Sequence, residues 1–296
     1  MSAIAELSVP EGASAELLVV NNASTDGTAA LLETCLLPNM PLRTVFEPRR
    51  GLGHARNAGM ARASGDVILF TDDDVRVPRE WLRVMCEPII AGRSDAVSGG
   101  VEMAPHLRRN WMTPRHRGFL ACTGPLWTEL PPGQTSLLGA SMAFSKEVLK
   151  DVPRFDPELG VGGFGFHEET LFSSQIKEAG YRVAFVDVVA EHHFDETRLS
   201  REGLLETAAK MGRSSAYMMH HWNHSRIRQI HLRLAAAALR LACCRAKERL
   251  LRRPSGGCSE KEMALLERCS LYKQFLVERR RPRNYAYHGL TKRNPE

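Results

Sequence analysis

The chain has 296 residues, of which 43% are hydrophobic and 25% charged, a composition typical of a globular protein with ample material for a core. The formal net charge of +6 is mild, no apolar run approaches the roughly 20 residues of a membrane span, and the first residues do not resemble a signal peptide. The seven cysteines are scattered without a CxxC pair, which argues against a disulfide framework or a zinc site and favours a cytoplasmic protein.

Strands and helices are predicted to alternate in the first 70 residues. Short apolar runs at Leu17–Val20, Val45–Phe46 and Val67–Phe70 are typical of strands buried on both faces. Helices are expected between them at Thr28–Leu36 and Arg49–Ala63. Strand, helix, strand, helix, strand at this spacing predicts a parallel α/β sheet with right-handed crossovers.

Three carboxylates, Asp72, Asp73 and Asp74, directly follow the third predicted strand. In open α/β sheets, ligands gather at the carboxyl ends of strands. Adjacent carboxylates repel one another, so without a cation one or more should take up a proton. Mg²⁺ or Mn²⁺ would remove that penalty, because both prefer oxygen ligands and often bind one or two carboxylates together with substrate phosphates. The triplet therefore predicts a metal–phosphate site, and a solvated acidic turn is the alternative.

The middle of the chain predicts further α/β elements and one long loop. Residues 104–136 are rich in Pro and Arg and read as a loop with a short helix, a kind of segment that is often functional. The small residues that begin at Gly139 would leave room for a substrate. The other predicted elements are a helix at Glu80–Ile90, strands at Asp95–Val101 and Gly139–Phe144, and a helix that starts at Ser145.

A second pair of carboxylates, Glu168 and Glu169, follows the glycine-rich loop Gly160–Phe166, which is expected to be flexible. The apolar residues after the pair lie on one helical face, so both carboxylates are expected at a helix N-terminus, where the helix dipole favours their ionised form. A purely capping role is the alternative. His192 and His193 come after a last predicted strand at Val183–Val189.

The character of the sequence changes after residue 200, which predicts domains at 1–200 and 201–296. Helices are expected at Gly203–Met219, Ser225–Arg252 and Ser259–Arg280, followed by a basic tail. The second of these helices is rich in Ala, Leu and Arg. Such a basic amphipathic helix suits a membrane surface, and packing on the domain or pairing with a second copy are the alternatives. No basic patch on a nucleic-acid reader is visible, so a nucleic-acid partner is not expected.

Several segments resemble a known family. VVNNASTDGT, GLGHARNAG and GDVILFTDDDVRVP resemble the nucleotide-sugar half of a family 2 glycosyltransferase with the GT-A fold. LLGASMAFSKEVL, HEETLFSSQIKEAGYRVAFV and EHHFDETRLS resemble later segments, in the family's order, over about residues 15–215. The resemblance implies a mostly parallel central sheet flanked by helices, here with a C-terminal helical extension. The strand with which the family normally opens is not recognised in this sequence. Either the assigned start is too late or the chain is a truncated copy. Loss of that strand would expose unpaired backbone in the sheet.

The resemblance also implies roles for individual residues. Glu169 stands where the family has the aspartate that acts as catalytic base, with Glu168 beside it. The metal would bind at Asp72–Asp74, with Asp73 and Asp74 slightly favoured, while Asp72 also lies near the ribose. The remaining substrate contacts implied are Asn21 and Asn22 at the nucleobase, Arg56 at the nucleotide, Gly139 at the donor sugar, and His192 or His193 at the metal or diphosphate.

The expected function is inverting transfer of a sugar from a nucleotide-diphosphate sugar to an acceptor hydroxyl, with Mg²⁺ or Mn²⁺. The acceptor is left open among a glycan, a lipid-linked molecule and a small molecule. The expected location is cytoplasmic, with a peripheral contact of the protein with the inner face of a membrane as a further option. One alternative is a catalytically inactive, truncated homologue that serves as a binding or membrane-surface module. A metal-dependent phosphohydrolase is a third reading, but no nucleophile arrangement is evident for it.

Overall fold

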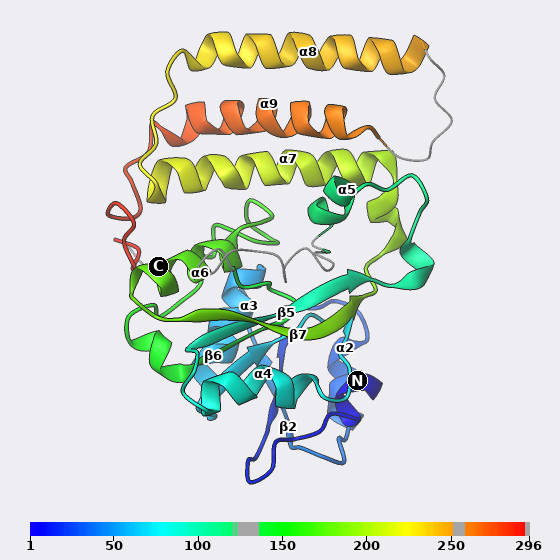
Figure 1. The fold of residues 1–296 in the computed structure, drawn as a ribbon, viewed down its shortest axis with the longest axis vertical. Coiled ribbons are helices and arrows are strands. Elements are labelled where there is room, and N and C mark those ends of the chain that lie inside the picture. Colours follow the sequence, from blue (N-terminus) through cyan, green and yellow to red (C-terminus); the bar gives the residue numbers. More distant parts are fainter. Residues whose placement is uncertain (121, 123–135, 251–257, 294–296) are drawn as a thin grey trace. The chain divides into compact units, whose positions relative to one another are not determined.

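The chain divides into two compact units in a computed structural model that describes residues 1–120, 122, 136–250 and 258–293 (Figure 1). Unit 1 comprises Met1–Ala104, Cys122–Gly163 and Glu168–His193. Unit 2 comprises Pro105–Ala121, Phe164–His167 and Phe194–Glu296. Three short segments of the predicted first domain, at residues 105–121, 164–167 and 194–200, therefore group with the C-terminal helices.

Unit 1 is built on a five-stranded mixed sheet with the strand order β3-β6-β5-β7-β4. β5 and β7 pair in parallel, whereas β6 runs antiparallel to both of its neighbours and β4 runs antiparallel to β7. The sequence pointed to a mostly parallel sheet, and three of these five strands do run in one direction. The strands are β3 (Val67–Phe70), β4 (Val75–Arg76), β5 (Ala96–Met103), β6 (Met142–Ser145) and β7 (Val183–His192).

A separate two-stranded parallel sheet holds β1 (Leu17–Asn21) and β2 (Leu42–Phe46). In the described part of the chain β1 is hydrogen-bonded as a strand to β2 alone, and β3 to β6 alone. The single sheet expected from the sequence is thus split between β1 and β3. Four of the five residues in β1 are only partly buried, whereas β5 is almost fully buried.

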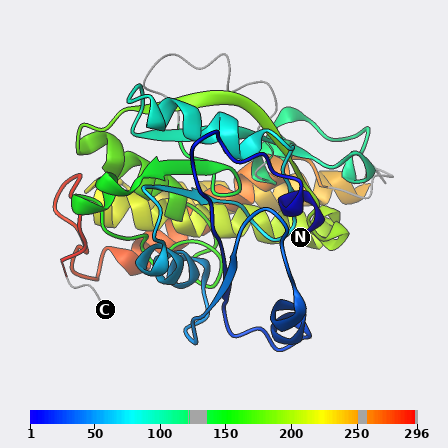
Figure 2. The ribbon, with the colours of Figure 1, turned by 90° about the horizontal axis from the view of Figure 1, so that it is seen from below.

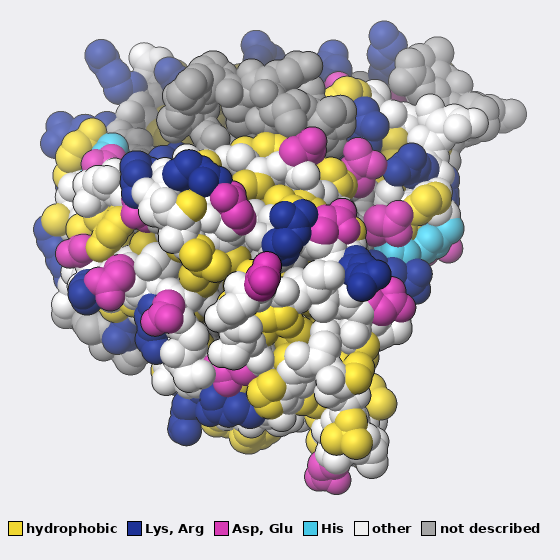
Figure 3. All heavy atoms as spheres, turned by 60° about the horizontal axis from the view of Figure 1, so that its bottom comes forward, with side chains coloured by type: hydrophobic (Ala, Val, Ile, Leu, Met, Phe, Trp, Pro, Cys, Tyr) yellow, Lys and Arg dark blue, Asp and Glu magenta, His cyan; other side chains and the backbone are white. Residues whose placement is uncertain are grey.

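Exposed apolar side chains accompany this split. Figure 2 shows the blue segment that contains α2 (Thr28–Thr34) projecting away from α4 (Trp81–Ile90), in cyan. Figure 3 shows hydrophobic side chains, in yellow, on a projecting part of the surface. Leu31, Leu36 and Phe46 in this part of the chain are 60%, 91% and 65% exposed.

Helices of unit 1 cover the strands through apolar faces. α3 (Leu52–Arg62) packs against β1 at Gly59, where a Cβ would lie 3.3 Å from Val20, and it places Met60 in the core. In α4 the Trp81 indole donates a hydrogen bond of 2.9 Å to the buried Ser141 hydroxyl of the sheet. The other helices are α1 (Ser2–Ala5), α2 (Thr28–Thr34), a 3₁₀ turn (Lys146–Lys150) and α6 (Glu168–Glu178).

The core of unit 1 contains an aromatic cluster beneath the carboxyl end of β3. Phe155 and Phe172 stack with ring centroids 4.2 Å apart, and Phe70 meets Phe155 edge to face at 5.8 Å. Phe144 and Ile68 complete the same cluster. Because these rings are packed against one another, the residues at the end of β3 stand on a rigid base.

Unit 2 is a layer of three long helices, in which α9 (Glu260–Glu278) lies between α7 (Arg201–Tyr217) and α8 (Ile230–Leu250) (Figure 1). Gly212 lets α7 and α9 approach closely, since a Cβ there would lie 2.1 Å from the Glu267 carbonyl oxygen. The shorter elements are 3₁₀ turns at Pro105–Leu107 and Glu196–Leu199, α5 (Pro114–Phe119), and a π-helical turn at Met218–Trp222 that continues α7.

Several elements differ from those predicted. The segment after Ser145 forms a 3₁₀ turn rather than an α-helix, the helix expected from Ser225 begins at Ile230, and the two-residue strand β4 was not predicted. Much of the loop at 104–136 and the break at 254–257 lie outside the described residues. Among the residues described, no helix is both long enough and apolar enough to cross a membrane.

Candidate active site

The turn that carries Asp72, Asp73 and Asp74 is held in place by β7. β4 follows the turn directly and pairs with the end of β7, with Val75 opposite His192. The His193 backbone N–H donates to the Asp74 carbonyl oxygen at 2.7 Å. The acidic turn is therefore fixed at the edge of the sheet by backbone hydrogen bonds.

Arg56 of α3 links two of the predicted carboxylates. Its guanidinium, only 4% exposed, donates from Nη1 to Glu168 Oε1 at 2.8 Å, and Nη2 lies 3.5 Å from Asp72 Oδ1. The same group lies over the rings of Phe70 and Phe155, at 5.8 and 5.4 Å from their centroids. Arg56 is thus an internal bridge between the end of β3 and the start of α6.

Two glycines make room for this bridge. A Cβ at Gly139 would lie 2.5 Å from Arg56 Nη2, and a Cβ at Gly160 would lie 2.8 Å from the Glu168 carboxyl carbon. Gly160 also has a positive φ of 73°, which favours glycine. The guanidinium lies beside the position that a Cβ at residue 139 would take, and contact of Gly139 with a donor sugar stays a prediction.

Burial raises the pKa of Glu168 to about 8, with the neighbouring Glu169 carboxylate adding to the rise and Arg56 opposing it. Burial also raises the pKa of Asp72, where Arg56 again opposes the shift and Asp74 adds to it. One guanidinium therefore offsets the effect of burial on these carboxyls only in part, and both pKa shifts favour the protonated form. The sequence predicted this imbalance at the Asp triplet, and the structure extends it to Glu168.

The two glutamates at the N-terminus of α6 have different surroundings. Glu168 is 4% exposed and bound to Arg56, whereas Glu169 is partly exposed. Both were predicted as catalytic residues. The burial of Glu168 suits a positioning role, and Glu169 is the carboxylate of the pair that solvent reaches.

His192 and His193, which the sequence could not separate, have different partners. His192 is 5% exposed, and its Nε2 lies 3.3 Å from Asp74 Oδ2. The ring of His193 instead lies 3.2 Å from Glu191 Oε2. His192 is therefore the histidine that faces the acidic turn.

The donor set at the turn suits a divalent cation completed by a substrate. Asp72 and Asp74 offer carboxylate oxygens, and His192 offers an imidazole beside them. Within the described residues no group of three or more potential ligands is gathered closely enough to hold an ion alone. Mg²⁺ and Mn²⁺ sites that use one or two carboxylates plus phosphate oxygens need no larger protein cluster.

Asn22 fixes the loop between β2 and α3. Its amide donates to the carbonyl oxygens of Glu47 and Arg49 at 2.9 and 2.7 Å, and its Oδ1 accepts from the Gly51 N–H at 2.7 Å. Both amide hydrogens are therefore used within the protein. Asn21 Oδ1 accepts from the Ser24 N–H at 2.9 Å. Contact of either residue with a nucleobase stays a prediction.

The glycine-rich loop that the sequence suggested to be flexible is packed against the start of α3. The Leu52 N–H donates to the Val161 carbonyl oxygen at 2.7 Å, and a Cβ at Gly162 would lie 2.6 Å from the Gly51 Cα. These glycines, with Gly160, are positioning residues that sequence reasoning missed. The run of alternating glycines was the available signal, since it permits close backbone approach.

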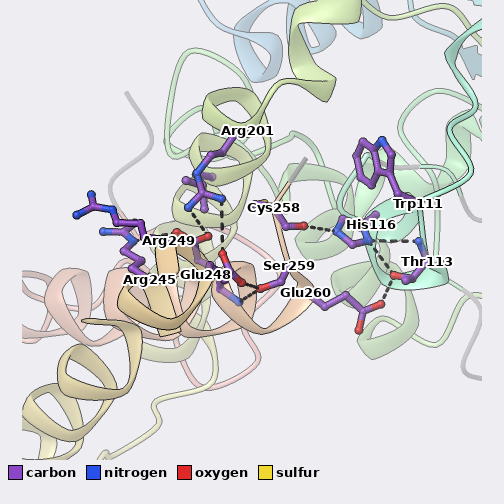
Figure 4. Close-up of a pocket in the computed structure, with 12 residues that line it drawn as sticks. Trp111, Thr113, His116, Arg201, Arg245, Glu248, Arg249, Cys258, Ser259 and Glu260 are labelled. Atoms are coloured by element: carbon purple, nitrogen blue, oxygen red, sulfur yellow. Dashed lines mark hydrogen bonds and ion pairs between the residues drawn. The ribbon is translucent and has the colours of Figure 1, made fainter. Parts of the chain in front are cut away.

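Unit 2 contains a separate polar cavity of about 660 Å³ (Figure 4). Glu262, whose side chain is fully buried, accepts from Arg201 at 2.5 Å and from Arg245 at 2.9 Å. Thr113 also bonds to Glu260, Ser259 to Glu248, and His116 to the Cys258 carbonyl oxygen. Since these charges satisfy one another, the cavity is a structural junction of α5, α7, α8 and α9.

Comparisons with known proteins identify the family. The family model described as "Glycosyl transferase family 2" matches residues 3–152. "Succinoglycan biosynthesis protein ExoM" of Rhizobium meliloti (strain 1021) is 27% identical over 254 residues, which cover 80% of this chain and 75% of that protein.

A solved structure shares the fold. Glucosyl-3-phosphoglycerate synthase from Mycobacterium tuberculosis, in complex with phosphoglyceric acid, aligns with a TM-score of 0.50 and 21% identity over 74% of this chain and 73% of that one. The fold is GT-A.

Proposed function

Because the chain belongs to glycosyl transferase family 2, we propose that it moves a sugar from a nucleotide-diphosphate sugar to an acceptor hydroxyl, with inversion at the anomeric carbon. The observation that carries the proposal is the convergence of the Asp72–Asp74 turn and the start of α6 on Arg56. The carboxyl groups of two distant segments, at Asp72 and Glu168, thereby lie around one centre.

Glu169 is proposed as the general base. It is the partly exposed carboxylate at the N-terminus of α6, beside the buried Glu168. In this role it would accept the proton of the acceptor hydroxyl while the hydroxyl oxygen attacks the anomeric carbon. The bond from that carbon to the diphosphate oxygen breaks, and its electron pair leaves with the nucleotide diphosphate.

Arg56 and Glu168 are proposed to position the reacting groups. The guanidinium is enclosed by two phenylalanine rings and bound to two carboxyls, so a direct contact with the diphosphate is not its primary role. By bonding Asp72 and Glu168 it would set the orientation of the acidic turn relative to Glu169.

Asp72 and Asp74 are proposed to hold Mg²⁺ or Mn²⁺ together with the donor diphosphate. Asp73, which is exposed, would complete the acidic turn at its outer side. When bound, the cation supplies charge to stabilise the departing diphosphate. His192 would keep Asp74 oriented through the contact between its Nε2 and Oδ2.

The acceptor is proposed to be a hydroxyl of a saccharide. This rests on the relative from Rhizobium meliloti, whose name places it in succinoglycan biosynthesis and of which 75% is covered. A peripheral contact with the inner face of a membrane, where an acceptor carried on a lipid would be available, is proposed with it.

The test is a screen of nucleotide sugars by thermal shift with Mn²⁺, followed by transfer assays with the donor that stabilises the protein. Glu169→Gln should lower the transfer rate about 10²- to 10⁴-fold and leave the donor-induced shift unchanged. Glu178→Gln, on the exposed end of the same helix, is the matched control. Full transfer by Glu169→Gln would remove Glu169 from the base role.

A further inference from the structure

We propose that the outer face of α8 is a docking surface for a membrane rich in anionic phospholipid. α8 packs on α9 through Leu234, Ala237, Leu241 and Cys244. The opposite face carries exposed leucines at Leu232 (68%), Leu239 (66%) and Leu250 (83%).

These leucines form one stripe. They lie 7 and 11 residues apart, which is about two and three helical turns, so all three point the same way. Small exposed residues fill the stripe between them, namely Ala235, Ala236, Ala242, Cys243 and Ala246. A continuous apolar stripe on the free face of a helix is the feature by which an interfacial helix enters the headgroup region.

The flanks of the stripe are basic. Arg233, Arg240 and Lys247, spaced seven residues apart, form a row along one flank, and Arg249 lies on the other, all of them exposed. The single acidic residue of α8, Glu248, is turned inward and bonds to Ser259. Long basic side chains beside an apolar stripe can reach anionic headgroups while the leucines enter the acyl boundary.

The positive charge of the chain is concentrated in its C-terminal part. From residue 194 to the end the sequence has 22 Lys and Arg against 10 Asp and Glu, whereas residues 1–193 have 18 against 24. The part of the chain that contains α8 is therefore strongly positive, whereas the rest is negative, and the two partly offset each other in the formal total of +6. This segregation favours an anionic surface as the partner of unit 2.

Charge also argues against a second copy as the occupant. Two α8 faces brought together would set the row of Arg233, Arg240 and Lys247 against basic residues of the other copy, with no carboxylate on either face. A nucleic-acid backbone offers no apolar surface on which the exposed leucines could be buried. A phospholipid bilayer offers both an apolar layer and negative charge.

The test is flotation of the full chain with vesicles, scored by lipid-bound protein and not by sugar transfer, so its failure is distinguishable from failure of the proposed function. The chain should float with phosphatidylcholine vesicles that contain phosphatidylglycerol and remain unbound to phosphatidylcholine alone. High salt should release part of it. Absence of flotation with the anionic vesicles would overturn the proposal.

Matched variants separate the stripe from general hydrophobicity. Leu232→Gln/Leu239→Gln should lower the partition coefficient at least about tenfold, because it removes two of the three inserted side chains. Leu31→Gln/Leu36→Gln, which changes two leucines of unit 1 that are 60% and 91% exposed, should leave the partition coefficient unchanged. Equal losses in both variants would contradict a specific role for α8.

A second pair of variants tests the basic row. Arg233→Glu/Arg240→Glu should weaken binding to the anionic vesicles at least about tenfold. Arg62→Glu/Arg83→Glu, which alters the net charge equally at exposed positions of unit 1, should weaken it far less. If instead the wild type proves dimeric by light scattering, and Leu232→Gln/Leu239→Gln makes it monomeric without any lipid binding, the face belongs to a second copy and the proposal is wrong.

Discussion

Arg56 and Glu168, which are 112 residues apart in the sequence, form a buried contact of 2.8 Å between α3 and the first residue of α6. The same guanidinium reaches Asp72 at 3.5 Å. The contact joins three segments of unit 1 at the point where the proposed catalytic groups are gathered, so its removal should affect stability and activity together.

Arg56→Met should destabilise unit 1 by about 3–5 kcal/mol, because it leaves the buried carboxyl of Glu168 without its cation. Arg56→Met/Glu168→Leu should lose less than the two single variants added together, since the double variant buries no unpaired charge. Urea denaturation of the four proteins gives the coupling energy. Strict additivity would mean that the two side chains do not act as a pair.

Gly139→Ala should lower the free energy of unfolding by about 1–3 kcal/mol. The new Cβ would lie 2.5 Å from Nη2 of Arg56, whose guanidinium is held by contacts with Asp72 and Glu168. Gly27→Ala is the control, since nothing lies within 4 Å of a Cβ at Gly27. Thermal unfolding of both variants measures the difference. Equal melting temperatures would show that Arg56 can move aside without cost.

Without divalent metal, unit 1 should become less stable as the pH rises towards 8. The pKa of Glu168 is raised from 4.5 to about 8 by burial, so the folded state binds the proton more tightly than the unfolded state does. The contribution of protonated Glu168 to the free energy of unfolding is fully present below pH 4.5 and is lost as the pH rises through about 8. Glu168→Gln, which cannot titrate, should flatten this slope in urea midpoints measured between these pH values, and an unchanged slope would assign it to other groups.

His192→Gln should raise the Mn²⁺ concentration needed for half-maximal transfer by about 10- to 100-fold, as expected when a group that orients a metal ligand is lost. His193→Gln, one residue further on, should change it little, because that ring contacts Glu191 rather than the acidic turn. Titration of Mn²⁺ in the transfer assay distinguishes them. The reverse order of effects would exchange the roles of the two histidines.

The sequence by itself determined where the chemistry lies along the chain. An apolar run that ends at Phe70 is a local pattern, and so is a helix whose first residues are Glu168 and Glu169, because each pattern is formed by residues within a few positions of one another. The amphipathic nature of α8 was visible in the same way, as a period of about 3.6 residues.

Only the tertiary structure decided which of these groups meet. The partner of Arg56, the choice of His192 over His193, and the space provided by Gly139 and Gly160 all depend on how α3, β6, β7 and α6 pack. The split between β1 and β3 and the free outer face of α8 were likewise settled by strand pairing and helix packing. A local pattern records that a side chain is buried, but the neighbours that bury it come from distant parts of the chain.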